Sequence, residues 1–195
     1  PSMAEQHGSP SWELDEDAVL RALMQATADT TGKAFFSTLV KSLAEVLDTH
    51  GAWVTEYLEP QRRLRALAFW LDGDFLDGYE HAIDGTPCEE VVDGAQFIHI
   101  PDRLMDLYPL DPDIPALGAV SYMGVPLQDL DGRVMGHLAV LDTRPLPAEP
   151  RYIALFRIFA SRASAELRRL RAEEQARERE AKLRRLVDSA LGAVV

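Results

Sequence analysis

The central feature of the sequence is residues 120–142, VSYMGVPLQDLDGRVMGHLAVLD. Two apolar runs, 120–127 and 133–141, are joined by Asp131-Gly132. An Asp-Gly step between apolar runs predicts an antiparallel β-hairpin, because both residues tolerate positive φ. Alternation along each run leaves apolar side chains on both faces. A hairpin of this kind is expected in the middle of a sheet that is covered on two sides.

Helical patterns precede this hairpin at the start of the chain. A helix is expected to begin near residue 15, where acidic residues suit the positive end of the helix dipole. Thr30-Thr31-Gly32 interrupts the pattern, and a second helical stretch follows that is expected to end at Gly51. Four strand-like runs are expected after it: 52–58, 64–71, 79–83 and 96–100.

Short helical pieces are expected between these strands and the hairpin. Thr86-Pro87-Cys88-Glu89 has the form of a capping box with proline at the first helical position, which predicts a helix to about residue 92. Another helical piece is expected at 101–108, and a Pro/Asp-rich loop at 109–115.

One long helix is expected from Pro150 onward, because apolar side chains recur at steps of three and four. Residues 171–182 are almost wholly charged, with pairs at i,i+4 spacing that keep a solvated helix stable. A docking surface at 173–180 is the alternative interpretation. The apolar pattern resumes at 183–191. We therefore expect a tag remnant or disordered leader at 1–14, a domain at 15–170, and at 171–195 a charged signalling helix with the start of a truncated following domain.

Composition limits the function classes. The chain is 47% hydrophobic and 27% charged, has one cysteine and carries a net charge of −12. These values predict a globular domain without disulfides, and we expect a cytoplasmic location. Residues 151–195 hold 11 Lys/Arg and 6 Asp/Glu, so the rest of the chain is strongly acidic. Such a body repels a phosphate backbone, so no direct nucleic-acid binding and no membrane span are expected.

The order of elements, Gly85-Thr86-Pro87-Cys88 and the Gly-Val-Pro-Leu, Asp-Gly-Arg and Gly-His-Leu-Ala-Val series of 124–140 together resemble a GAF domain over residues 15–170. GAF domains are small-molecule sensory modules of bacterial signalling proteins. The chain is most similar to those that precede PAS, histidine-kinase, cyclase or σ54-activator modules, of the formate-hydrogenlyase activator type. Residues 183–190 resemble the first helix of a PAS domain.

The resemblance implies an α+β fold with a central six-stranded antiparallel sheet. It places the N- and C-terminal helices on one face of the sheet and the short helices of 86–118 over a ligand pocket on the other. It further implies a homodimer paired through the N- and C-terminal helices, and a regulatory rather than catalytic role. Ligand occupancy would then reach an output module through the C-terminal helix.

Seven residues are expected at the ligand pocket. Trp70, Phe97, Tyr108 and Tyr122 are aromatic side chains expected on the roofed side of the sheet, where apolar walls with a few polar groups form small-ligand sites. The family analogy adds Cys88, His99 and His137. For each of them the alternative interpretation is an ordinary core residue.

Two other functions stay open at this point. Cys88 near a helix N-terminus suits a reactive thiolate, which would make the protein a small redox enzyme or redox sensor, whereas a lone cysteine is usually a small buried hydrophobe. A purely structural dimerisation module is the other. The ligand is unknown. Glu89 stands where bilin-carrying GAF domains have histidine, which argues against a bilin, and the spacing of His99, His137 and Cys88 argues against haem or a metal.

Overall fold

The computed structural model describes residues 16–194, so the leader expected at 1–14 lies outside the described residues. The described elements, in chain order, are α1 (Glu16–Thr27), α2 (Gly32–Leu47), β1 (Gly51–Leu58), η1 (Glu59–Gln61), β2 (Arg63–Leu71), β3 (Asp74–Phe75), β4 (Glu80–Ala82), α3 (Pro87–Asp93), β5 (Ile98–Ile100), α4 (Leu104–Leu107), α5 (Asp113–Leu117), β6 (Ser121–Gln128), β7 (Val134–Asp142) and α6 (Pro150–Gly192).

The strands form one antiparallel sheet in the order β3-β2-β1-β7-β6-β5, with β4 paired to β2. The predicted α+β fold with a hairpin of β6 and β7 inside the sheet is confirmed. The six predicted strands are all present, and the two-residue β3 makes a seventh.

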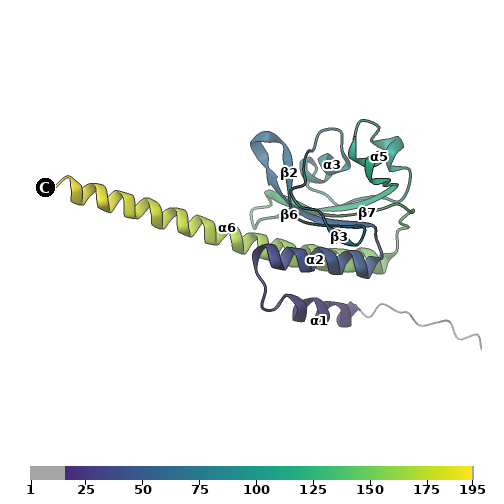
Figure 1. Ribbon diagram of the computed structural model, residues 1–195, viewed down its shortest axis with the longest axis horizontal. Coiled ribbons are helices and arrows are strands. Elements are labelled where there is room, and N and C mark those ends of the chain that lie inside the picture. The colour runs from purple at the N-terminus through teal and green to yellow at the C-terminus, as the bar shows by residue number, and fades with distance from the viewer. Residues whose placement is uncertain (1–15, 195) are drawn as a thin grey trace, which may run out of the picture.

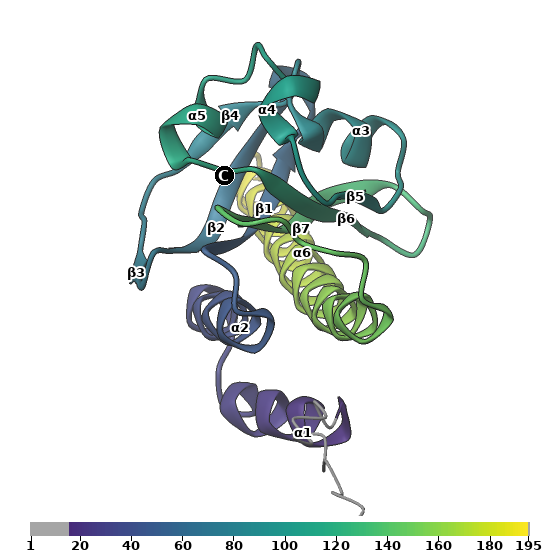
Figure 2. The same cartoon turned by 90° about the vertical axis from the view of Figure 1, so that its right-hand side faces the viewer.

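Helices cover both faces of this sheet. In Figure 2, α2 and α6 lie under one face and α3, α4 and α5 lie over the other. The N-terminal helices and α6 lie on the same side of the sheet, as the resemblance implied; α2 and α6 pack on the sheet, and α1 packs on α2 and α6. Figure 1 shows α1 as a further layer outside α2, where Leu23 is buried in the helix-side core.

Successive side chains of the central hairpin point to opposite faces of the sheet and so contribute to two separate cores. Met123 and Val125 of β6 join the core shared with α2 and α6, whereas Tyr122 joins the core under the short helices. In β7 the regular alternation breaks at Met135. Leu127 pairs with Gly136 and Gln128 with Val134, so Met135 is a bulged residue and enters the helix-side core.

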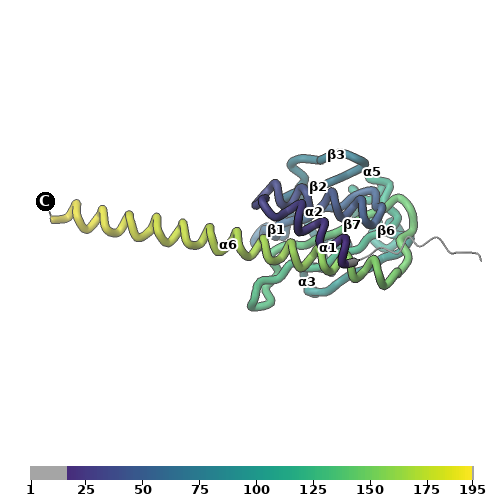
Figure 3. The backbone as a smooth tube through the Cα atoms, turned by 90° about the horizontal axis from the view of Figure 1, so that it is seen from below, coloured from purple at the N-terminus to yellow at the C-terminus, as the bar shows by residue number. Residues whose placement is uncertain are grey.

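The helix α6 has two parts of different character. Its first part carries Leu155, Phe156 and Phe159 into the helix-side core, while the second part projects alone from the body (Figure 3). Arg168 donates to the Gln128 carbonyl at 2.9 Å and so fastens α6 to the central hairpin. No helix within residues 16–194 has the length and apolarity needed to cross a bilayer.

The buried carboxylate of Glu166 joins α6 to the start of α2. It accepts a hydrogen bond from the Gly32 N–H at 3.0 Å and pairs with Arg169 at 2.7 Å. The positive end of the α2 dipole favours an anion there. The N-terminus of α2 is therefore anchored on α6.

Three local predictions were wrong. The second helix ends at Leu47 rather than Gly51, because Asp48 adopts a left-handed conformation that closes it. The Thr86 hydroxyl does not cap α3 but donates to the Ile83 carbonyl, and the Glu89 carboxylate accepts from the Gly85 N–H instead. The Pro/Asp-rich segment at 109–115 is not only a loop, since α5 begins within it at Asp113.

Candidate functional site

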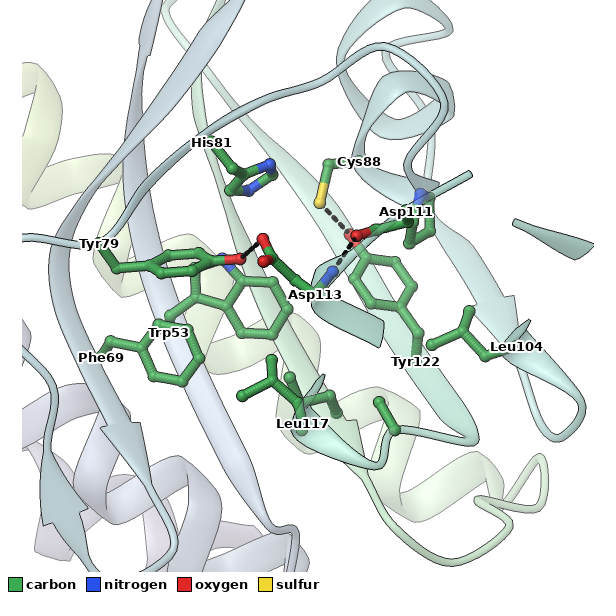
Figure 4. A pocket seen from close by; sticks show the side chains of 13 residues that line it. Trp53, Phe69, Tyr79, His81, Cys88, Leu104, Asp111, Asp113, Leu117 and Tyr122 are labelled. Atoms are coloured by element: carbon green, nitrogen blue, oxygen red, sulfur yellow. Dashed lines mark hydrogen bonds between the residues drawn. The ribbon is translucent and has the colours of Figure 1, made fainter. Parts of the chain in front are cut away.

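A small cavity lies between the sheet and the short helices (Figure 4). Its volume is about 30 Å³, which on the usual measure is room for about two water molecules. Aromatic residues of the sheet face, short-helix residues and a few polar groups line it: Trp53, Phe69, Tyr79, His81, Pro87, Cys88, Leu104, Asp111, Asp113, Leu117, Ala119, Tyr122 and Leu141.

Four buried polar side chains from four elements meet at one end of this cavity. The Tyr122 hydroxyl of β6 donates to Cys88 Sγ of α3 at 3.4 Å. Cys88 Sγ lies 3.2 Å from Nε2 of His137 on β7, and Nδ1 of His137 lies 2.6 Å from Thr55 Oγ1 on β1. Each of the four side chains is at most 2% exposed. We call this set, Thr55, His137, Cys88 and Tyr122, the buried polar chain.

Burial keeps the members of the buried polar chain uncharged. It raises the pKa of the Cys88 thiol to about 12, against a smaller opposing effect of the Tyr122 hydrogen bond. Burial also lowers the pKa of His137 to about 3, with His81 acting in the same direction. At neutral pH the thiol therefore keeps its proton and the imidazole is neutral. This arrangement argues against a Cys88 nucleophile, because the thiolate is the reactive form.

Two glycines of the central hairpin make room for the buried polar chain. A Cβ at Gly124 would overlap the Tyr122 side chain, which lies along β6, at 2.7 Å from its Cζ atom. A Cβ at Gly136 would overlap the Thr55 carbonyl oxygen. Glycine at 124 thus lets the Tyr122 hydroxyl reach Cys88, and glycine at 136 lets β7 approach β1 beside Thr55.

An arginine holds α3 in place above the sheet. Arg62, at the turn between β1 and β2, bonds Asp84 at 2.9 Å just before α3 and Asp93 at 2.8 Å at its last residue. One guanidinium therefore binds both ends of α3. Its position fixes where Cys88, in the first turn of that helix, meets the sheet.

Acidic groups form another side of the cavity. The Tyr79 hydroxyl donates to Asp113 at 2.6 Å, and the Asp113 N–H donates to the Asp111 carboxylate at 2.9 Å. Burial is the main cause that raises the pKa of Asp111, and burial likewise lowers the pKa of His81. Figure 4 shows these side chains around the same space as Cys88 and Tyr122.

Two nitrogen atoms at the cavity have no hydrogen-bond partner. Nε1 of Trp53 and Nε2 of His81 are both buried and unpaired. In Figure 4 the nitrogen of the Trp53 indole lies on the edge of the ring that faces His81. An unpaired polar atom in a protein interior costs about 1–3 kcal/mol. A polar ligand in the cavity could therefore form hydrogen bonds with these two nitrogens in addition to its apolar contacts with the walls.

The structure brings together some of the seven predicted residues. Cys88 and Tyr122 line the cavity, and His137 lies behind Cys88 within hydrogen-bond distance. Tyr108 packs at the edge of the roofed core, where its hydroxyl donates to Glu90 at 2.6 Å, and it is not a lining residue.

The other three predicted residues lie on the opposite face of the sheet, and their assignment to the pocket side was wrong. Trp70 pairs with Ala52 and meets Phe75 edge-on, with Lys41 of α2 over its ring. Phe97 contacts Phe156 of α6, and the His99 ring bonds the Leu146 carbonyl at 2.7 Å. The strand register causes this, because Ala52 and Met123, the partners of Trp70 and His99, belong to the helix-side core.

Sequence reasoning missed most of the aromatic and acidic lining. Trp53 and Phe69 stack at 5.1 Å with an interplanar angle of 9°, and Tyr79 meets Phe69 edge-on at 5.1 Å. Asp111 and Asp113 were counted only as loop-forming residues. Within residues 16–194 no group of three His, Cys, Asp or Glu side chains is arranged to hold a metal ion.

Comparisons with known proteins agree with this fold. The family model of the GAF domain matches residues 15–167. The chain belongs to the GAF domain family. GAF domains are small-molecule-sensing regulatory domains, which places the cavity in a family whose members bind ligands. No curated protein sequence matches the chain.

Solved GAF structures share the fold at low sequence identity. The GAF domain of an Acinetobacter phosphoenolpyruvate-protein phosphotransferase is similar at a TM-score of 0.67 and 14% identity, covering 82% of this chain and 97% of its own. That of the Coxiella burnetii phosphotransferase gives 0.68 and 17%, covering 82% and 96%. The chromophore-binding domain of a bacteriophytochrome from R. palustris gives 0.67 and 10%, covering 86% and 64%.

The Gly124–Tyr122 contact predicts a coupled effect on stability. Gly124→Ala should lower the free energy of unfolding by about 1–3 kcal/mol, because the added methyl group overpacks a filled site. In a Tyr122→Leu background the same change should cost at least about 1 kcal/mol less. Urea unfolding of the four proteins measures the coupling. Phe36→Leu in the other core is the control background, and equal costs of Gly124→Ala in all backgrounds would contradict the packing described.

Burial of Cys88 predicts an inert thiol. Labelling by an aromatic disulfide reagent between pH 7 and 9 should be at least about 100-fold slower in the native protein than in urea, because the sulfur is covered and protonated. Ser189→Cys provides a matched exposed thiol in the same protein, which should react fast. Rapid native labelling of Cys88 with a midpoint near pH 8 would restore the redox interpretation.

Proposed function

We propose that this GAF domain senses a small molecule in the cavity under α3, α4 and α5 and passes its occupancy to an output module through α6. The observation that carries the proposal is the pair of unpaired nitrogens, Trp53 Nε1 and His81 Nε2, inside a cavity with an aromatic wall. A ligand that forms hydrogen bonds with both nitrogens removes the free-energy cost of leaving them unpaired in the interior, so binding stabilises the native domain.

Two strands connect the cavity to α6 and support transmission of ligand occupancy. In each strand, one side chain lines the cavity and its neighbour packs in the helix-side core. On β1, Trp53 lines the cavity, and its neighbour Val54 packs in the core that includes Phe156 and Phe159 of α6. On β7, Leu141 lines the cavity and its neighbour Val140 packs in the helix-side core. Because protein interiors are close-packed, a ligand that moves Trp53 or Leu141 also moves the side chains beneath α6.

The projecting part of α6 supports pairing with a second copy. Large apolar side chains stay exposed there at helical spacing: Leu183, Leu186, Val187 and Leu191. Between them and the body, Glu173 and Glu180 bond arginines four residues away, which stabilises a solvated helix. We infer a homodimer in which these apolar residues face each other, with α1 and α6 at the interface.

The likeness of residues 183–190 to the first helix of a PAS domain supports an output module of the PAS, histidine-kinase, cyclase or σ54-activator kind. The protein is then a signal-transduction or transcription-regulatory protein, and this domain is its sensory part. The alternative is a purely structural domain that holds two chains together and has no functional cavity. The next experiment distinguishes this alternative from the sensor.

Native mass spectrometry of the purified protein tests the sensor proposal. The protein is first incubated with a metabolite extract so that a ligand lost during purification can rebind. A dimer should then carry a small extra mass that disappears on denaturation, and Ala119→Leu should abolish that mass because leucine fills the cavity. Ala66→Leu, the same change on the same face of the sheet outside the lining residues, should retain it. A dimer without added mass in every variant favours the structural module, and a monomer contradicts helix pairing.

A further inference from the structure

The carboxylates at the cavity lack cationic partners. Asp111 is 8% exposed, and within residues 16–194 neither Asp111 nor Asp113 forms a salt bridge with a lysine or arginine. Asp113 accepts a hydrogen bond from the Tyr79 hydroxyl, and the Asp111 carboxylate accepts from the backbone N–H groups of Asp113 and Ile114 at the start of α5. A carboxylate has about four acceptor sites, so both keep acceptor capacity at the cavity. Two acidic side chains so placed favour a cation over an anion or a neutral molecule.

The unpaired nitrogens add a second requirement. Nδ1 of His81 lies 3.0 Å from the Ala82 carbonyl, which only accepts, so Nδ1 carries the ring proton and Nε2 of the neutral ring is an acceptor. The indole of Trp53, which is 4% exposed, only donates. A hydroxyl group has both functions, because its oxygen accepts from an N–H donor such as Trp53 Nε1 and its hydrogen is donated to an acceptor such as His81 Nε2.

The aromatic wall suits the same kind of ligand. Trp53, Phe69 and Tyr79 present ring surfaces in succession around the cavity. A ring face attracts an organic cation electrostatically, and tryptophan does so most strongly. The volume of about 30 Å³ has room for about two non-hydrogen atoms, so a ligand of four such atoms requires the short helices to move outward as it binds.

We propose that the cavity binds a small protonated amino alcohol, a molecule with one ammonium and one hydroxyl group separated by about two carbon atoms. The ammonium lies at Asp111 and Asp113 with the ring faces of the aromatic wall beside it, and the hydroxyl bonds Trp53 Nε1 and His81 Nε2. This assignment rests on the proposed sensory function and names the class of molecule sensed.

Ethanolammonium is the probe, with three matched molecules of the same length. Ethylene glycol lacks the charge, propylammonium lacks the hydroxyl, and glycolate reverses the charge. Titration of the intact chain is followed by the indole N–H signal of Trp53, assigned by its loss in Trp53→Phe. Ethanolammonium should shift this signal with a Kd of about 0.05–5 mM, as expected for a ligand of four non-hydrogen atoms. Each of the other three should bind at least about tenfold more weakly.

Variants test the roles of the side chains. Asp111→Asn and Asp113→Asn should each weaken ethanolammonium at least about tenfold, because each removes one charge-assisted contact. Trp53→Phe should remove most of the preference for ethanolammonium over propylammonium, measured by calorimetry. Asp131→Asn, at the exposed hairpin turn, loses the same charge far from the cavity and should bind as the original chain does. Equal ethanolammonium affinity in Asp113→Asn would overturn the assignment.

The outcomes separate this inference from the sensory proposal. If ethylene glycol or glycolate shifts the Trp53 signal as strongly as ethanolammonium, the amino-alcohol inference is wrong and a ligand-binding cavity stands. If no probe shifts it while purified protein carries a mass that Ala119→Leu abolishes, the inference is again wrong and the sensory function stands. If neither is seen, both fail.

Discussion

The hydrogen bonds of the buried polar chain constrain the rest of the domain. Thr55, His137, Cys88 and Tyr122 come from β1, β7, α3 and β6, and each of them is at most 2% exposed. Removing any member would leave a neighbour unpaired in the interior, which costs more than the bond itself contributes. The approach of β7 to β1 and the end wall of the cavity follow from this requirement, which acts together with Arg62 to position α3.

The buried polar chain and the cavity differ in whether their polar groups have hydrogen-bond partners. Both lie in one core, yet the first pairs its polar groups internally and the second leaves Trp53 and His81 unpaired. The two unpaired nitrogens can accept a ligand as their hydrogen-bond partner, whereas the buried polar chain has no need of one. The sheet then separates this binding face from the helical face, where α2 and α6 pack and where pairing with another chain is proposed.

The separate helices and strands were predicted well because alternation and turn chemistry are local signals, and the family resemblance implied how these elements are arranged. The Asp131-Gly132 hairpin, the proline-led helix at Cys88 and the long helix from Pro150 need only neighbouring residues to be recognised. The site was harder to predict, since the face that a strand side chain occupies depends on register. Trp70 follows Ala52 onto the helical face, while Trp53 one residue farther along β1 lines the cavity. Asp111 and Asp113 were missed because a Pro/Asp-rich segment has the composition of an ordinary loop.

Distance measurement between two copies of α6 tests the link between cavity and helix most directly. Nitroxide labels on Ser189→Cys report the separation of the projecting helices by pulsed electron paramagnetic resonance, with buried Cys88 left unlabelled. Filling the cavity by Ala119→Leu should shift the mean distance by at least about 2 Å, the scale of helix shifts in signalling proteins, and Ala66→Leu should not. Identical distance distributions in all three proteins, or no distance between copies at all, would contradict transmission through α6.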